Sequence, residues 1–154
     1  MTTQEKRQAL MAEALSWQNT GFEHGQCLKG VLADCSTFPA SCYRHVGLFR
    51  PEIPVLPPDW FLHTRTEVYL KELLRYAVEF TPAEKTPEPG DFVLFKDVSV
   101  GAKVCSHGAL VVEWGIRQRV IHAFPPRVMV SNVRTFPALA HKPMRFFDPF
   151  ARVA

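Results

Sequence analysis

The sequence lacks long apolar runs. Its apolar stretches, such as residues 109–112, are far shorter than the roughly 18 residues that a membrane-spanning helix needs, which excludes a membrane span. The first residues are polar, and Glu13 interrupts the apolar stretch that follows, so the N-terminus lacks the apolar centre of a secretory signal peptide. We therefore expect the chain to be synthesised in the cytoplasm without a signal peptide.

Charge of one sign is also scarce. The formal net charge is only +3, and Lys and Arg are scattered rather than gathered into a stripe, which argues against a nucleic-acid partner. The four cysteines include no C-x-x-C pair, so the common zinc and redox signatures are missing, and in the cytoplasm we expect these cysteines to stay reduced. There is no glycine-rich phosphate loop of the usual pattern. We expect neither a metal nor another cofactor.

What is present is typical of one compact domain. A chain of 154 residues, 47% of them hydrophobic, is long and apolar enough to bury a core. We expect a single domain over residues 1–154. Twelve Phe and three Trp predict an aromatic-rich core, and thirteen Pro argue against a long helical bundle.

Helical patterns fill the first half of the chain and strand patterns the second. Thr2 and Glu5 form a capping-box pattern that predicts a helix ending near Asn19. A second helix is expected from about Cys35 to Val46, capped by its preceding residues, with Pro39 tolerated only in the first turn. A third helix is predicted by an apolar stripe at Leu70, Leu73, Leu74, Ala77 and Val78.

Short β-rich runs follow at 92–95, 109–112, 119–122, 128–130 and 145–147, so the fold class is α+β with a C-terminal antiparallel sheet.

Cys35 is the first candidate for chemistry. A cysteine at the start of a helix lies in the positive end of the helix dipole, which favours the nucleophilic thiolate. On this argument the pKa of Cys35 should fall below the roughly 8.5 of a free thiol. The alternative is a buried, inert cysteine. Cys27 and Cys42 have no such setting and are interpreted as loop or core residues.

Two histidines supply candidate partners. His107 begins a predicted strand and His122 lies on the next one, so two antiparallel strands joined near Gly115 would bring the imidazoles side by side. One would serve as base for a thiol and the other would orient it, as the acid does in a Ser-His-Asp triad. The alternative for His122 is a half-buried strand residue without a catalytic role.

Other readings of these residues remain open. Cys105 shares a strand face with His107 and is interpreted as a core or site-lining residue. A zinc site built from Cys35, Cys105, His107 and His122 is conceivable by ligand type, although no paired local spacing supports it. His24 lies in a glycine-flanked loop and is a candidate cleft residue, whereas His45, His63 and His141 are interpreted as surface residues.

Five segments occur in a characteristic order along the chain: Trp17-Gln18-Asn19-Thr20-Gly21-Phe22, Gly30-Val31-Leu32-Ala33-Asp34-Cys35-Ser36, Pro89-Gly90-Asp91-Phe92-Val93-Leu94-Phe95, Ser106-His107-Gly108-Ala109-Leu110-Val111-Val112 and Val120-Ile121-His122-Ala123. This ordered set resembles the NlpC family of papain-like cell-wall cysteine peptidases, in particular its short phage tail-associated members. The five segments follow the family's order over nearly the whole chain. The segment Pro57-Pro58-Asp59-Trp60-Phe61-Leu62-His63 is similar to the phage subgroup.

The resemblance implies a set of roles. Cys35 would be the nucleophile, His107 the base and His122 the orienting third residue, on a papain-like fold whose nucleophile helix packs against the sheet that bears both histidines. The implied reaction is hydrolysis of an amide in the peptidoglycan stem peptide, often between D-glutamate and a diamino acid. Asp34 and Ser36 are candidates to hold polar groups of the substrate.

Two departures from the family pattern bear on activity. Phe22, a candidate substrate-binding residue together with His24, stands where the family commonly has a tyrosine, so that hydroxyl is missing. Thr37 and Pro39 replace residues more usual in the catalytic helix. An inactive structural tail component of the same fold is therefore one alternative. Another is an amidase or acyltransferase that acts on a lipid or a small amide, which a long apolar groove would favour over a polar cleft.

The partners implied are the peptidoglycan stem peptide and, for a virion protein assembled in the cytoplasm, other phage tail proteins.

Overall fold

The computed structural model describes residues 1–152 and has the predicted α+β class. Its helices are α1 (Thr3–Leu15), α2 (Thr37–His45), the 3-10 turn η1 (Trp60–Leu62) and α3 (Val68–Leu74). Its strands are β1 (Gly21–Phe22), β2 (Cys27–Leu28), β3 (Leu32–Ala33), β4 (Val78–Phe80), β5 (Phe92–Phe95), β6 (His107–Trp114), β7 (Gln118–Phe124), β8 (Arg127–Asn132) and β9 (Met144–Asp148).

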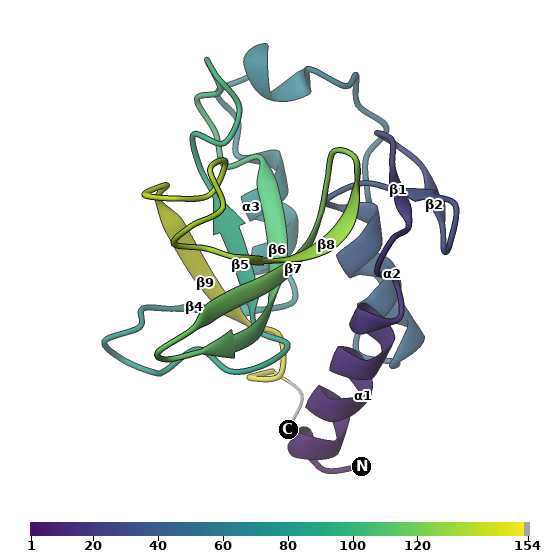
Figure 1. Ribbon diagram of the computed structural model, residues 1–154, viewed down its shortest axis with the longest axis vertical. Helices are drawn as coiled ribbons and strands as arrows, with labels where there is room; N and C mark the ends of the chain where they lie inside the picture. Colours follow the sequence, from purple (N-terminus) through teal and green to yellow (C-terminus); the bar gives the residue numbers. More distant parts are fainter. Residues whose placement is uncertain (153–154) are drawn as a thin grey trace.

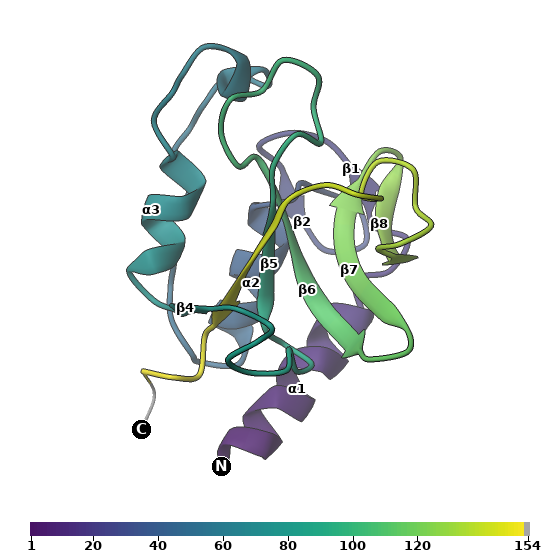
Figure 2. The same cartoon turned by 90° about the vertical axis from the view of Figure 1, so that its left-hand side faces the viewer.

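The strands form one curled sheet in the order β2-β3-β1-β8-β7-β6-β5-β9-β4. The long central strands β5 to β8 pair antiparallel, as the strand patterns predict. The short strands β1 to β3 extend the edge beyond β8, and β1 pairs parallel to β3, so the sheet is mixed rather than wholly antiparallel. In Figure 1, α1 and α2 lie along one side of the sheet, and Figure 2 shows α3 standing apart from them beside β5.

The first two helices begin where their sequence signals predict, but the first ends at Leu15 rather than near Asn19 because residues 16–19 form a turn. Thr2 caps α1 through a capping box with Glu5, and the helix ends at Leu15. Helix α2 begins at Thr37 after the N-cap Ser36. Pro39 is the third residue of α2, where a backbone N–H has no intrahelical acceptor, so it costs no helical hydrogen bond.

The third helix is shorter than predicted. Helix α3 ends at Leu74, and the chain has changed to strand β4 by Val78. The apolar stripe is correct at Leu70 and Leu73, which are buried, but Leu74 and Val78 are exposed. The prediction of a helix through Val78 is wrong because this segment pairs with β9, a partner about 70 residues away that the local pattern does not contain.

The pleat of β5 divides the core in two. Phe92 and Leu94 face a cluster that includes Leu10 of α1 and Phe38 of α2. Their neighbours Val93 and Phe95 face a second cluster on the opposite side of the sheet, with residues such as Phe146 of β9. Both faces of the central strands are therefore covered by apolar side chains.

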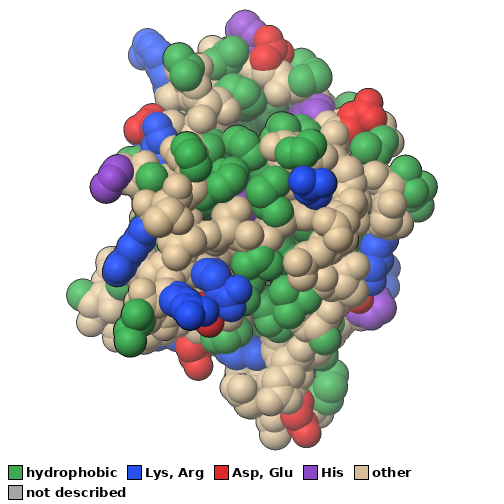
Figure 3. Space-filling view, in the orientation of Figure 1, with side chains coloured by type: hydrophobic (Ala, Val, Ile, Leu, Met, Phe, Trp, Pro, Cys, Tyr) green, Lys and Arg blue, Asp and Glu red, His purple; other side chains and the backbone are tan. Residues whose placement is uncertain are grey.

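The segment around η1 and the loop 96–106 extend beyond one end of the sheet (Figures 1 and 2). The two segments lie side by side at Gly101 and Leu62. A Cβ atom built onto Gly101 would be in van der Waals contact with a methyl carbon of Leu62, at 3.5 Å. Val55, Leu62 and Val100 are exposed on them, and we call these three residues the apolar rim. Figure 3 shows hydrophobic side chains gathered across the upper part of this face of the molecule.

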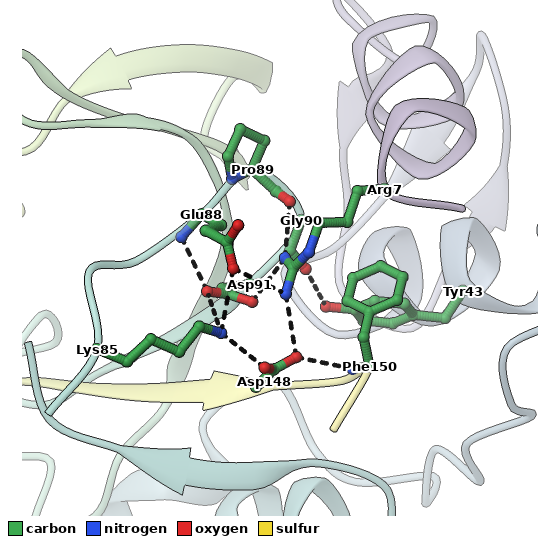
Figure 4. Close-up of polar contacts among 9 residues, drawn as sticks. All are labelled: Arg7, Tyr43, Lys85, Glu88, Pro89, Gly90, Asp91, Asp148 and Phe150. Carbon is green, nitrogen blue, oxygen red and sulfur yellow. Dashed lines mark hydrogen bonds and ion pairs between the residues drawn. The ribbon is translucent and has the colours of Figure 1, made fainter. Parts of the chain in front are cut away.

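A buried charge cluster joins the N-terminal helix to the sheet (Figure 4). The guanidinium of Arg7 donates to Asp91 Oδ1 at 2.8 Å and to Asp148 Oδ1 at 3.2 Å. Lys85 bridges the other oxygens of the same two carboxylates. Asp91 is fully buried and Arg7 nearly so. Each charge has lost its hydration, and the ion pairs and hydrogen bonds to its partners compensate for that loss. The cluster thereby fixes α1 against the start of β5 and the end of β9.

No helix within residues 1–152 is both long enough and apolar enough to cross a bilayer.

Loss of the Arg7 guanidinium should destabilise the fold. Arg7→Leu leaves the buried Asp91 carboxylate with Lys85 as its remaining cation, and we expect the free energy of unfolding to fall by about 3 kcal/mol. Urea denaturation followed by circular dichroism measures this. Gln8→Leu, on the exposed side of the same helix, is the control and should stay within about 0.5 kcal/mol of the parent. An Arg7→Leu protein as stable as the control would contradict a structural role for the cluster.

Candidate active site

Cys35 lies directly before the N-cap of α2, as the sequence predicts. The carboxylate of Asp34 organises this turn. Its Oδ1 accepts the backbone N–H groups of Ser36 and Thr37 at 2.9 and 2.8 Å. Its Oδ2 accepts the N–H of Gly25 at 2.7 Å. Asp34 therefore caps the helix and ties the preceding loop to it, which fixes the position of the cysteine between them.

The same carboxylate alters the electrostatics of the thiol. Burial, with a further contribution from the Asp34 charge, raises the pKa of Cys35 to about 12. The sequence-based expectation of a pKa below 8.5 is therefore wrong in direction. The helix terminus does present N–H groups, but two of them are bonded to a full negative charge that lies next to the sulfur. The resting Cys35 is a neutral thiol, and its Sγ donates to the Ser106 carbonyl at 3.5 Å.

The two histidines meet as the strand pairing predicts. Leu110 of β6 pairs with Ile121 of β7, which sets His107 and His122 on one face in diagonal positions. Nε2 of His107 lies 2.8 Å from Nδ1 of His122, and Nε2 of His122 lies 2.8 Å from the hydroxyl of Ser131 on β8. Ser131 continues this chain of hydrogen bonds and was not among the residues singled out by the sequence.

Both imidazoles are neutral at pH 7. Burial lowers the pKa of His122 to about 4, and burial together with the neighbouring His122 lowers the pKa of His107 well below its ordinary value of 6.5. Aromatic rings surround the pair, including Phe124 on β7 and Phe136 beyond β8. Within residues 1–152, Nδ1 of His107 makes no hydrogen bond and is not among the buried unpartnered atoms, so it is accessible from the cavity that His107 lines and free to accept a proton.

Two further residues position the cysteine, and sequence reasoning missed both. The hydroxyl of Tyr69 on α3 donates to the carbonyl oxygen of Cys35 at 2.6 Å. A side chain on Gly108 would clash with this hydroxyl and with the ring of Phe92, so only glycine fits there. For Gly108 there was a signal, since a glycine inside a strand often marks a close approach of another group. For Tyr69 there was none, because nothing in the sequence connects α3 with a turn 34 residues earlier.

Cys35 and His107 line one cavity of about 560 Å³. All four predicted substrate-binding residues, Phe22, His24, Asp34 and Ser36, also line it. His24 and Asp34 have little free hydrogen-bonding capacity, since Nε2 of His24 lies 2.7 Å from the Leu56 carbonyl and both Asp34 oxygens accept backbone N–H groups. Ser36 donates its hydroxyl to Asp34 at 2.8 Å. Phe22 contributes an apolar surface.

The hydroxyl of Ser106, at the wall of the same cavity, differs from other buried polar groups. Among the described residues it is the buried side-chain polar atom that has no hydrogen-bond partner. A buried hydroxyl without a partner costs free energy, so its presence beside Cys35 makes it an available donor for a bound molecule.

The zinc alternative finds no support in the geometry. Within residues 1–152, no group of three or more His, Cys, Asp and Glu side chains is placed to hold a metal ion. Cys105 is buried just before β6, where its N–H donates to Glu67. Cys27 is exposed and Cys42 is buried in the core, and all four cysteines are free thiols.

Comparison with known proteins places the fold. No protein-family model matches the sequence, and no curated protein matches it either. Among solved structures, it is similar to NlpC1 from Trichomonas vaginalis, with a TM-score of 0.65 and 15% identity over 96% of this chain and 44% of that one. It is also similar to a lipoprotein-like NLP/P60 family protein from Staphylococcus aureus, with a TM-score of 0.61 and 19% identity over 94% of this chain and 42% of that one. The chain has the NlpC/P60 fold.

A third similar structure has nearly the same length. The NlpC/p60 domain of the peptidoglycan hydrolase SagA matches with a TM-score of 0.59 and 19% identity, over 90% of this chain and 96% of that domain. The chain thus covers nearly the whole of that domain, and it spans less than half the length of the other two proteins. The predicted papain-like, α+β architecture is confirmed.

The pH dependence of thiol alkylation tests the electrostatics of Cys35. Because its pKa is raised to about 12, the thiolate fraction and hence the rate with iodoacetamide should keep rising up to at least pH 10. Asp34→Asn keeps an acceptor for the helix N–H groups but removes the charge, so its profile should shift to lower pH. Mass mapping separates Cys35 from the exposed Cys27. A plateau below pH 8.5 in the parent protein would show a preformed thiolate and contradict this account.

Proposed function

We propose that the chain is a cysteine hydrolase that cleaves amide bonds in peptidoglycan stem peptides. The observation that carries the proposal is the arrangement of Cys35 at the start of α2 and the His107–His122 pair on the same cavity. The similarity of the fold to NlpC/P60 proteins, one of them a peptidoglycan hydrolase, supports it. In its finer form, the proposal is that the scissile bond joins D-glutamate to a diamino acid.

The hydrogen bonds of the two imidazoles are compatible with one route for the proton. If His122 donates from Nε2 to Ser131, its Nδ1 accepts from Nε2–H of His107, and Nδ1 of His107 is left unprotonated. His107 can then take the Cys35 proton while the sulfur attacks the carbonyl carbon, and later deliver it to the leaving amine. His122 would hold the imidazole in this tautomer and stabilise the imidazolium that forms.

The neutral resting pair suits this sequence of events. The pKa of the thiol is raised and that of His107 is lowered, so the proton stays on sulfur until a carbonyl is in place. The developing oxyanion needs donors, for which the Cys35 backbone N–H and the unpartnered Ser106 hydroxyl are candidates. The Ser106 hydroxyl would take the role of the tyrosine hydroxyl that is missing at Phe22.

Delivery by a phage tail is the second part of the proposal. It rests on the similarity of residues 57–63 and the helix that follows them to the phage subgroup of the family. In that setting the enzyme would reach the wall from outside the cell, together with other tail proteins.

Cleavage of purified muropeptides, analysed by mass spectrometry, tests the reaction. We expect fragments with a free amine on the diamino acid, no turnover with Cys35→Ala, and a loss of about 10²- to 10⁴-fold in kcat/KM with His107→Ala. His122→Asn should lower kcat more than it raises KM, since it acts through His107. His45→Asn changes an exposed histidine and should match the parent protein.

Two outcomes would contradict the proposal. Equal product with and without Cys35 would assign the cleavage to another group. A folded parent protein that leaves every muropeptide intact would favour the alternative of an inactive structural component with the same fold.

A further inference from the structure

The cavity beside Cys35 has an unusual charge distribution for a site that binds peptides with several carboxylates. Its lining within the described residues includes no Lys or Arg, whereas three acidic residues, Asp34, Glu52 and Glu72, belong to it. A γ-linked glutamate keeps its α-carboxylate, and a carboxylate taken out of water without a cation or a sufficient set of donors is strongly disfavoured. The carboxylates of a stem peptide therefore find no cation in these walls, and its ammonium groups alone find charged partners there.

Most of the wall away from Cys35 is apolar. It is formed by the segment before and within η1 together with α3, through Phe49, Ile53, Leu56, Trp60, Phe61 and Leu73. At the Cys35 end, His24 and Asp34 are already bonded within the protein, and in the wall formed by α3 the Glu72 carboxylate accepts the backbone N–H of Glu52. The geometry is that of an apolar chamber with a nucleophile at one end.

The apolar lining reaches the protein surface at Val55, which lines the cavity and is fully exposed. Leu62 and Val100, the other two residues of the apolar rim, are exposed on the segments that carry other lining residues, such as Phe61 and Val98. An apolar cavity with exposed apolar side chains beside it favours a ligand that is itself apolar over most of its length.

We infer that the site accepts a second class of substrate, acyl compounds whose aliphatic chain lies in the cavity while the ester or amide carbonyl lies at Cys35. This inference rests on the Cys35 chemistry of the proposed function and extends its range of substrates. The volume of about 560 Å³ is within the range of pockets that enclose most of a small ligand.

The reaction with such a substrate balances without a further reagent except water. The Cys35 sulfur bonds to the acyl carbon, the bond from that carbon to the leaving oxygen or nitrogen breaks, and the thiol proton passes through His107 to the leaving group. Water then attacks the thioester, which yields the carboxylic acid and restores the thiol.

A series of p-nitrophenyl esters from acetate to octanoate, below their aggregation limits, tests the inference. We expect kcat/KM to rise by roughly two- to fourfold for each added methylene until the chain fills the cavity. Cys35→Ala should abolish turnover, and the parent protein should carry a transient acyl group on Cys35 by mass spectrometry.

Ile53→Glu places a charge in the wall and should lower the ratio of kcat/KM for the octanoate ester to that for the acetate ester about tenfold or more. Val31→Glu, at an exposed apolar position outside the cavity, should keep the parent ratio.

Binding to the inactive variant separates this inference from the proposed function. Octanamide should bind Cys35→Ala at least tenfold more tightly than butanamide, as measured by calorimetry. A flat ester series with Cys35-dependent turnover of acetate would overturn the inference and leave the proposed chemistry intact. Chain-length-dependent binding without Cys35-dependent turnover of any ester or muropeptide would support the apolar site and overturn the chemistry. Failure of octanamide to bind would overturn the inference.

Discussion

The hydrogen bond between His107 and His122 is the interaction on which the candidate site depends. It joins two buried imidazoles on neighbouring strands, and it extends to Ser131 on a third. Such a chain is stable in an apolar environment only when its members are bonded, so the register of β6, β7 and β8 has to be held. A slip of one residue would turn both rings to the other face of the sheet. The apolar clusters on both faces of the central strands oppose such a slip.

The Asp34 carboxylate is the second constraint. It holds Cys35 in place, but its charge disfavours the reactive thiolate form of that residue. It fixes the turn that carries Cys35 by capping α2 and holding Gly25. Its negative charge, added to burial, also keeps the thiol protonated. A site with a protonated thiol and neutral imidazoles is protected against adventitious alkylation and oxidation, because the thiolate is the reactive form. Reactivity then depends on the carbonyl group that binds.

The sequence predicts most of the fold because its signals are local. The capping box of α1, the proline within the first turn of α2 and the β-rich composition of the short runs each involve a few neighbouring residues. The errors arise where distant partners decide the structure. Strand β4 exists through pairing with β9, and Tyr69 reaches Cys35 across 34 positions.

The candidate site was predictable in part for the same reason. The meeting of His107 and His122 follows from two adjacent strands and one turn. The raised pKa of Cys35 does not, since the dipole argument considers the helix alone, while the burial of the thiol and the bonds made by Asp34 are properties of the folded chain. The absence of Lys and Arg from the described lining of the cavity likewise emerges only when segments far apart in the sequence are brought together.

The most direct test of the central claim, a neutral thiol served by a neutral and correctly oriented imidazole, is ¹⁵N NMR of the histidine side chains from pH 7 to pH 4. The account predicts that at pH 7 both His107 and His122 are neutral and carry their proton on Nε2, with His122 gaining a proton only near pH 4. An imidazolium signal from either ring at pH 7, or a proton on Nδ1 of His107, would contradict it.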